Sequence, residues 1–390
     1  MAFRLLYDMA RIIYALSGQG RGHTSRVIAV SDALRQRGHD VLFCCGGTAR
    51  EILESQGEAV LPVPPLRQVM EGNEVRLAET MRCNLHEVLN LSETVAQLSE
   101  AFLDYRADLL ITDFEAFSPR AARRIGLPVL SFNHQQIVTE TAYDLPPRHW
   151  FHAAITTFAI RMIAPTNPEH ILITSFFFPP LKHPERTTLV PPIIRPAVQA
   201  LTPTRGEHVL VYYNHTDGAG HVLDTLRRVD APFVVYNFEA PQNAADYPNL
   251  QFKEPSLDGF LDDLATSRAV LCTAGFTLTS EALFLGKPLL VVPNRGIFEQ
   301  TINALFLEAE GLGAAVLDRP VAPRDVETFL KARNAYEARL DARRACGNEA
   351  ALDCIERVLR KEPPRPFPRP DLPTNGHTDT PVAVPAAKLD

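Results

Sequence analysis

The chain has 390 residues, of which 46% are hydrophobic and 22% charged, and its net charge is −7. This composition excludes collagen-like and wholly disordered proteins, and the length predicts two domains. The acidic balance gives no overall attraction to nucleic acid. No run of about 18 apolar residues predicts a membrane span, and Arg11 interrupts the first apolar stretch. We therefore expect a cytoplasmic protein without a signal peptide.

The cysteines show no C-x-x-C spacing and no histidine spacing that would complete a zinc site. We therefore expect free thiols in a reducing compartment and no bound metal. The six are Cys44, Cys45, Cys83, Cys272, Cys346 and Cys354.

Strands and helices are predicted to alternate in the first half of the chain. Apolar runs predict strands at 11–16, 41–44, 59–61, 109–112 and 129–132. Apolar residues at helical spacing predict helices at 24–37, 48–56 and 120–124, and 66–105 is expected to be helical with loops. This alternation predicts a parallel sheet with helices on both faces.

The alternation restarts after a proline-rich linker at 190–204. Strands are expected at 209–213, 233–236, 269–272 and 289–292, and helices at 222–229, 257–265, 277–285, 299–310 and 336–360. Eight of the 32 prolines lie in the last 30 residues, which predicts a disordered tail. We expect one domain at 1–200, a second at 201–361 and the tail at 362–390.

A glycine-rich turn, Gly18-Gln19-Gly20-Arg21-Gly22-His23, separates the first predicted strand from the first helix. Glycines let the backbone approach a ligand closely, and a helix amino end offers free N–H groups. The spacing differs from the G-x-G-x-x-G of dinucleotide-binding proteins, so NAD is not expected. His23 is a candidate general base, the alternative being a histidine that only caps the helix.

Polar side chains also follow the fourth and fifth predicted strands. Asp113 and Glu115 are candidates to orient an acceptor hydroxyl or take its proton, the alternative being a turn that caps the next helix. Asn133, His134 and Gln135 suit recognition of acceptor hydroxyls, the alternative being a polar loop without a ligand.

The strongest motif runs from the strand at 269–272 into the following helix. Gly275 opens the turn, and the hydroxyls of Thr277, Thr279 and Ser280 lie in or near the first helical turn. Free N–H groups, a favourable helix dipole and hydroxyl donors together predict a diphosphate site.

Further polar residues follow this motif. Glu281 is placed to accept a hydrogen bond from a ribose hydroxyl. Glu299, Gln300 and Asn303 form a polar cluster at the start of the next helix, which suits the hydroxyls of a sugar.

The segment from Gly275 to Gly313 resembles the donor-binding core of GT-B glycosyltransferases, most of all the MurG-like branch of glycosyltransferase family 28. The turn from Gly18 to Arg26 resembles the first glycine loop of that branch. Asp113-Phe114-Glu115 with Phe132-Asn133-His134-Gln135 resembles a bacterial and archaeal subgroup of it. The resemblance covers roughly residues 11–360. Tyr212-Tyr213-Asn214-His215-Thr216-Asp217 departs from the Gly-Ser-rich loop of MurG, which leaves the choice of nucleotide open.

The resemblance implies an α/β protein of GT-B type, with two Rossmann-like domains facing each other across a cleft. It implies an inverting glycosyltransferase that uses a nucleotide-sugar, with UDP-sugar as the expected donor. The second domain would hold the diphosphate at Gly275, Thr277 and Ser280, the ribose at Glu281 and the sugar at Glu299 and Gln300. The first domain would hold the acceptor, with His23 in the cleft.

An inverting transfer needs a base for the acceptor hydroxyl and stabilisation of the leaving diphosphate. His23 is the first candidate base, followed by Asp113 and Glu115, and Arg21 or Arg26 could assist the leaving group. No D-x-D motif occurs, so no metal–diphosphate site of that kind and no cofactor are expected.

Three alternatives remain open. One is a nucleotide-sugar 2-epimerase of the same fold, and another is an inert binding protein that keeps the donor pocket. The third is a transferase at the membrane surface that acts on a lipid-linked acceptor through the stretch at 176–182, which a buried strand would also explain.

Overall fold

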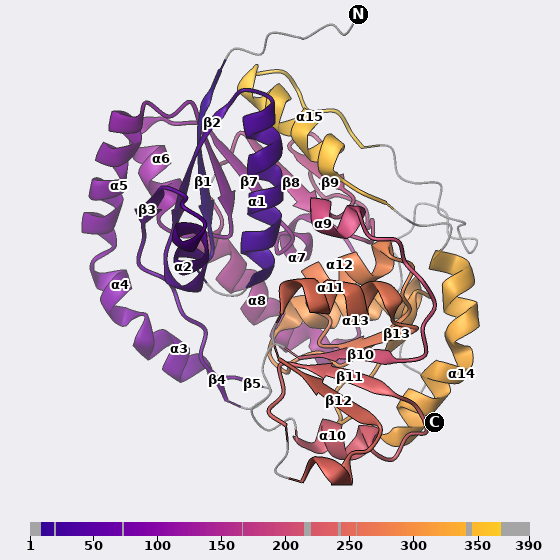
Figure 1. Ribbon diagram of the computed structural model, residues 1–390. Coiled ribbons are helices and arrows are strands. Elements are labelled where there is room, and N and C mark those ends of the chain that lie inside the picture. The colour runs from indigo at the N-terminus through magenta and orange to yellow at the C-terminus, as the bar shows by residue number, and fades with distance from the viewer. Residues whose placement is uncertain are drawn as a thin grey trace, which may run out of the picture.

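The computed structural model describes residues 9–18, 21–71, 74–165, 167–213, 220–240, 243–254, 256–340 and 345–367. They form two parallel β-sheets, each covered by helices, which lie side by side in Figure 1. The expectation of an α/β fold with two Rossmann-like domains is confirmed.

The first sheet has seven parallel strands in the order β3-β2-β1-β6-β7-β8-β9. Its central strands are buried along their length, as the apolar runs predicted. The strands are β1 (Arg11–Leu16), β2 (Asp40–Cys45), β3 (Val60–Pro62), β6 (Leu109–Asp113), β7 (Val129–Asn133), β8 (His170–Thr174) and β9 (Thr187–Val190).

The helices of this domain cover both faces of the sheet (Figure 1). They are α1 (Arg21–Gln36), α2 (Gly47–Ser55), α3 (Leu77–Cys83), α4 (Leu85–Leu89), α5 (Leu91–Tyr105), α6 (Ser118–Ile125), α7 (Ile137–Glu140) and α8 (Trp150–Ile163), with a short 3₁₀ turn η1 (Pro147–His149). A small antiparallel hairpin, β4 (Met70–Glu71) with β5 (Glu74–Val75), precedes α3.

The second sheet has six parallel strands in the order β12-β11-β10-β13-β14-β15. They are β10 (Val209–Tyr212), β11 (Phe233–Tyr236), β12 (Leu250–Lys253), β13 (Ala269–Cys272), β14 (Leu289–Val291) and β15 (Gly313–Ala315). Its helices are α10 (Gly220–Leu226), α11 (Leu257–Thr266), α12 (Phe276–Phe284), α13 (Phe298–Ala309) and α14 (Pro323–Leu340), with a 3₁₀ turn η2 (Ala244–Asp246).

The two sheets are joined where the linker was expected. After β9 the chain runs through Ile193 and Ile194, both buried, into the short helix α9 (Pro196–Gln199) and on to β10. Asn348 fixes this segment, because its side chain accepts from the backbone N of Ile194 and donates to the backbone O of the same residue, each at 2.9 Å. The linker is therefore packed into the protein.

The last helix, α15 (Asn348–Leu359), corrects the expected boundary of the second domain. Its apolar residues, Leu352 and Ile355 among them, belong to the core of the first domain. On the same helix, Glu356 accepts a hydrogen bond from Nε2 of His39 at 3.0 Å, and Nδ1 of His39 accepts from the backbone N of Ala10. The range 201–361 therefore contains a helix that returns to the first domain.

Other elements also differ from the prediction. The single helix expected at 336–360 is two helices, α14 and α15, which pack on different domains. Strands β8, β9, β12 and β15 and helix α8 were not predicted.

The tail was expected to begin at 362, but residues 362–367 are described and Phe367 packs against the first core. The remainder of the predicted tail lies outside the described residues.

The stretch at 176–182 is not the buried strand that was one of its two explanations, although part of it is buried. Phe177 is fully buried and stacks on Phe306 of the second domain, with ring centroids 4.1 Å apart. Burial against the other domain explains this aromatic run.

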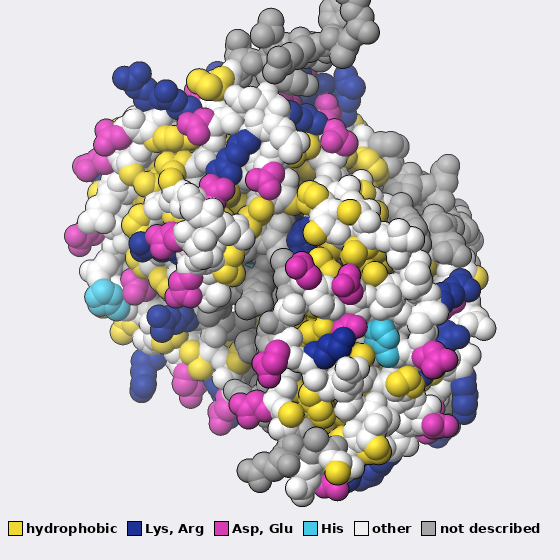
Figure 2. Space-filling view, viewed as in Figure 1, with side chains coloured by type: hydrophobic (Ala, Val, Ile, Leu, Met, Phe, Trp, Pro, Cys, Tyr) yellow, Lys and Arg dark blue, Asp and Glu magenta, His cyan; other side chains and the backbone are white. Residues whose placement is uncertain are grey.

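The cysteines and the surface agree with the expectations from composition. All six cysteines are free. In the described part of the chain, no helix is long and apolar enough to cross a bilayer. On the face shown in Figure 2, acidic and basic side chains are interspersed.

The position of α15 gives a first testable prediction. Ile355→Ala should destabilise the first domain by about 2–5 kcal/mol, because truncating a fully buried side chain leaves a cavity. Hydrogen exchange in rising urea should show earlier opening of β1 and β8 than in the wild type, with β10 and β13 unchanged. Asp353→Ala, on the exposed side of the same helix, is the matched control. Loss of protection in β10 instead of β1 would contradict the assignment of α15 to the first domain.

Candidate active site

The candidate site begins at the edge where β1 and β6 end. Leu16 lies opposite Asp113 in the parallel register of these strands, and the backbone N of Ser17 donates to the backbone O of Asp113. The chain then enters α1, whose first turn carries His23 and whose second carries Arg26. The sheet therefore brings residues 90 positions apart in sequence into contact.

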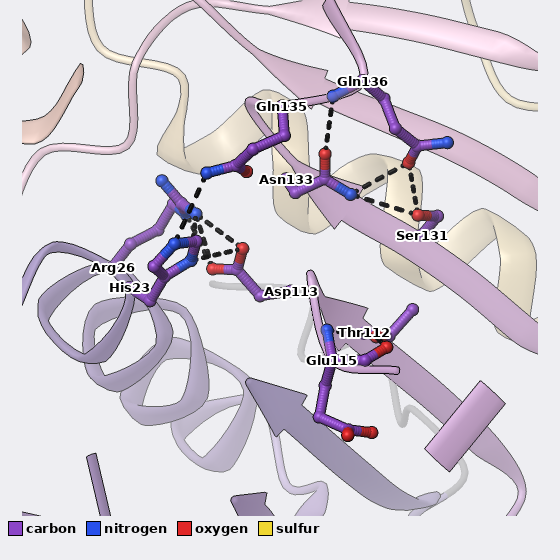
Figure 3. Close-up of polar contacts among 9 residues, drawn as sticks. All are labelled: His23, Arg26, Thr112, Asp113, Glu115, Ser131, Asn133, Gln135 and Gln136. Atoms are coloured by element: carbon purple, nitrogen blue, oxygen red, sulfur yellow. Dashed lines mark hydrogen bonds and ion pairs between the residues drawn. The ribbon is translucent and has the colours of Figure 1, made fainter. Parts of the chain in front are cut away.

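Asp113 is the centre of this contact (Figure 3). Its carboxylate is fully buried and accepts from Nδ1 of His23 at 2.9 Å and from Nη2 of Arg26 at 2.7 Å. Burial alone would raise the pKa of Asp113, but the charges of Arg26 and His23 and their hydrogen bonds outweigh it and lower the pKa below its ordinary value. Asp113 is therefore an ionised acceptor.

This arrangement fixes the orientation of His23. A carboxylate only accepts, so Nδ1 of His23 carries the proton, and in the neutral imidazole Nε2 carries the lone pair. The side-chain N of Gln135 lies 3.4 Å from that Nε2, and the His23 side chain keeps 17% of its surface exposed. The structure thus places the predicted residues His23, Asp113 and Gln135 together, with Nε2 of His23 on the side of Gln135.

Glu115 lies apart from this group. Phe114 adopts a left-handed backbone conformation (φ 60°), and after this turn the Glu115 side chain points away from His23 in Figure 3. The carboxylate accepts from the backbone N of Phe117 at 2.8 Å and from Ser118 at the amino end of α6. This geometry favours the capping alternative, with Glu115 in the place expected of an aspartate.

Asn133 has a similar structural role. Its side-chain O accepts from the backbone N of Gln136 at 2.9 Å, and its side-chain N donates to Oε1 of Gln136 at 2.9 Å. The amide is buried and bonded within its own turn. Of the acceptor-side candidates, only Gln135 reaches His23.

His134 joins the two domains. It is buried, its ring stacks on Phe276 with centroids 3.9 Å apart, and its Nε2 lies 2.8 Å from the side-chain O of Asn303. Its Nδ1 bonds to the backbone O of Thr174. Burial lowers the pKa of His134. His134 and Asn303, predicted for the acceptor and the donor sugar, thus contact each other across the domain boundary.

The amino ends of α1 and α12 meet at the same boundary. A Cβ added at Gly22 would lie only 2.7 Å from Oγ1 of Thr277, so the glycine permits the close approach. The Arg26 guanidinium lies over the ring of Phe276, 5.9 Å from its centroid. The charge of Arg26 is balanced by Asp113, so the two helix amino ends are the features of this boundary that favour an anion.

The start of α12 has the geometry expected of an anion site. Gly275 precedes the helix and gives no side-chain cap to its first N–H groups. Thr277 is half-buried at the helix start, whereas Thr279 and Ser280 are buried, and the Ser280 hydroxyl has no hydrogen-bond partner among the described residues. Their contact with a diphosphate stays a prediction.

Glu281 is already paired. Both carboxylate oxygens accept from Arg195, at 2.6 and 2.8 Å, and the carboxylate is buried. Arg195 lies just before α9 in the linker, and its role was not predicted because nothing in the sequence pairs the two positions. A ribose hydroxyl could bind to Glu281 only while the carboxylate also bonds to Arg195. The ribose contact at Glu281 stays a prediction.

The remaining candidates are spread over the start of α13. The side-chain O of Gln300 accepts from the backbone N of Asn294 at 2.8 Å, and Asn303 also donates to the backbone O of Ala274. Glu299, in the first turn, is half-exposed. Glu299 is therefore the member of the predicted cluster that is most available to a ligand.

Part of the glycine-rich turn lies outside the described residues. Gly20 and the side chain of Arg21 are among these. Gly18 is described, and a Cβ there would lie 2.7 Å from the backbone O of Gly46, so this glycine serves close packing of the backbone. Within the described ranges, no group of three His, Cys, Asp or Glu side chains could hold a metal ion.

Comparisons with known proteins agree with the fold. A solved structure titled as the glycotransferase of kitacinnamycin superposes with a TM-score of 0.65 at 17% identity, covering 90% of this chain and 99% of that one. An uncharacterized glycosyltransferase of Methanosarcina acetivorans is 23% identical over 331 residues, 78% of this chain and 84% of that protein.

A more limited match concerns the MurG-like branch. The UDP-N-acetylglucosamine–N-acetylmuramyl-(pentapeptide) pyrophosphoryl-undecaprenol N-acetylglucosamine transferase of Clostridioides difficile is 30% identical over 113 residues, 27% of this chain and 28% of that protein. Membership of this branch is thus only weakly supported. These proteins are transferases, and none supports the epimerase alternative.

The family model described as "Glycosyl transferase family 1" matches residues 10–333, which include both sheets and the group around His23. This chain belongs to that family and is a glycosyltransferase.

Proposed function

We propose that the protein transfers a sugar from a UDP-sugar to an acceptor hydroxyl, with inversion at the anomeric carbon. The observation that carries the proposal is the orientation of His23, whose Nδ1 is held by the ionised Asp113, so that Nε2, beside Gln135, is the nitrogen left to accept a proton. A general base needs an open lone pair and a partner that stabilises its protonated form. His23 with Asp113 supplies both.

The reaction is one displacement. The acceptor hydroxyl loses its proton to Nε2 of His23, its oxygen forms a bond to the anomeric carbon, and the bond from that carbon to the diphosphate breaks. The electron pair leaves with the diphosphate. Asp113 does not take the proton but stabilises the imidazolium, because its carboxylate stays ionised.

The leaving diphosphate would be bound where α12 begins. No side chain caps the start of α12, and its Thr277 lies against Gly22 at the amino end of α1, so the positive ends of two helices would stabilise the developing charge. Such a site can act without a divalent ion. Glu299 is left to bind hydroxyls of the donor sugar, and Gln135 is placed beside the base to contact the acceptor.

The choice of UDP rests on the resemblance and on the name of the Clostridioides difficile relative, a UDP-N-acetylglucosamine transferase. The same name gives a pyrophosphoryl-undecaprenol acceptor, so a lipid-linked alcohol is the alternative to a soluble acceptor, with peripheral membrane contact in that case.

Removal of the imidazole tests the base. His23→Ala should lower kcat by about 100-fold or more, since positioned general bases typically contribute that much, while the affinity for the donor changes little. Steady-state kinetics at saturating donor and calorimetric titration with UDP measure the two quantities. His152→Ala, an exposed histidine on α8, is the control. A kcat within about threefold of the wild type would exclude His23 as the base.

A double-mutant cycle tests the pairing of His23 with Asp113. Asp113→Asn should also lower kcat, because it removes the charge that stabilises the imidazolium. In the His23→Ala background it should cost almost nothing more, since residues that act as a unit are not additive. Losses that multiply would show that Asp113 acts independently of His23. The single variant should unfold at a lower temperature, because Arg26 then keeps a buried, uncompensated charge.

Nucleotide binding tests the donor site. In a thermal-shift screen of UDP, dTDP and GDP, UDP should raise the Tm most, and uridine should have little effect because it lacks the diphosphate. Thr277→Val should weaken UDP about two- to tenfold, the loss expected for one hydrogen bond. Thr266→Val, on an exposed part of α11, is the matched control. Equal stabilisation by UDP and uridine would contradict a diphosphate site at α12.

A further inference from the structure

A cavity of about 420 Å³ lies in the first domain, apart from the candidate active site. Its walls come from α7, the end of α8, the turn that leads to β8 and the loop before β9. Ile171 and Arg186 lie at the amino ends of β8 and β9, whereas His23 and Asp113 lie at the carboxyl edge of the sheet. None of the residues that line the cavity belongs to the proposed machinery of transfer.

Basic side chains surround this cavity. Arg161 comes from α8, and Lys182, His183 and Arg186 come from the loop before β9. The ammonium of Lys182 donates to the backbone O of Thr139 at 2.9 Å, a partner without charge. No carboxylate of the described residues lies within 4.0 Å of the charged groups of Arg161 or Lys182. Partial burial lowers the pKa of Lys182, as does the nearby Arg161, whereas Glu140 raises it.

One carboxylate lines the cavity and does not balance these charges. Glu140 lies 3.5 Å from Arg186, a long contact for an ion pair, and its side chain is 14% exposed. This contact is made to Oε2 of Glu140, which is buried and has no hydrogen-bond partner within the described residues. Three permanent cations therefore face one anion, in a chain whose net charge is −7. This local excess of positive charge predicts attraction for an anion.

The floor of the cavity is apolar. Ile160 and Ile171 are 2% and 3% exposed and line it together with Pro168. A volume of this size is in the range of pockets for small organic ligands. Arginine and lysine at the rim of an apolar pocket suit a phosphate attached to a small organic group.

We propose that this cavity binds a phosphate-bearing ligand through Arg161, Lys182 and Arg186. The phosphate oxygens are held by the guanidinium and ammonium groups, and the organic part of the ligand packs on Ile160 and Ile171.

The phosphate can come from a soluble phosphate ester or from a phospholipid headgroup. The second source is relevant because α8, which supplies Arg161, exposes a row of large apolar side chains to solvent. These are Trp150, Phe151, Phe158 and Met162, each more than half exposed. A helix with such a face can lie in the boundary between headgroups and acyl chains.

The binding test uses inorganic pyrophosphate as the probe, measured by calorimetry on the full chain. Lys182→Gln/Arg186→Gln removes two charges from the cavity, and Arg324→Gln/Lys331→Gln removes two from exposed positions on α14 as the matched control. Wild type and control should bind pyrophosphate equally at this site. The cavity variant should bind it at least about tenfold more weakly, because it lacks two charge-assisted hydrogen bonds. UDP titration serves as the check on folding and on the donor site, and it should be equal in all three.

Equal pyrophosphate affinity in the cavity variant and the wild type would overturn the proposal, and so would the absence of any pyrophosphate site beyond the one that UDP blocks. Flotation with vesicles distinguishes the two sources. Binding to phosphatidylglycerol–phosphatidylcholine vesicles that is lost in Lys182→Gln/Arg186→Gln and in Phe151→Ser/Phe158→Ser identifies a headgroup. Pyrophosphate binding without flotation identifies a soluble phosphate ester.

Discussion

The candidate site depends on one buried negative charge, the carboxylate of Asp113. It would be costly to bury alone, and it is stable because Arg26 and His23 both donate to it. The same contacts decide the chemistry, since they fix which nitrogen of His23 carries the proton and which can accept one. Arg26 in turn packs over Phe276 of the second domain. One carboxylate thus links the end of β6, the start of α1 and the boundary between the domains.

Much of the fold could be predicted from the sequence, because each buried strand of a parallel sheet is a continuous apolar run that needs no knowledge of its neighbours. The runs at 109–112 and 269–272 are examples, and both are strands. Strands β8 and β9 were not predicted, since the histidine that begins β8 and the two threonines that begin β9 interrupt the apolar pattern. Helix α8 is apolar on an exposed face, so its pattern gave no usable sign of which side is buried.

The sequence predicted those residues of the candidate site that lie at or just after the end of a predicted strand. Asp113 ends β6, His23 and Gln135 come shortly after β1 and β7, and the adjacency of these three strands brings the residues together. The sequence does not show which polar side chains are bonded to other residues of the protein and are therefore less available to a ligand. Glu115 caps a helix and Glu281 pairs with Arg195, 86 residues away, and such pairings depend on packing that a single sequence does not encode locally.

The return of α15 to the first domain has a consequence for synthesis. Helix α15 follows the entire second domain in the chain, and yet it supplies part of the first core. On a ribosome, the first sheet emerges early and exposes the apolar surface that Leu352 and Ile355 later cover. The second domain, whose strands are contiguous between β10 and β15, can complete its folding before the first. The first domain therefore completes its native packing only after α15, and with it the whole second domain, has been synthesised.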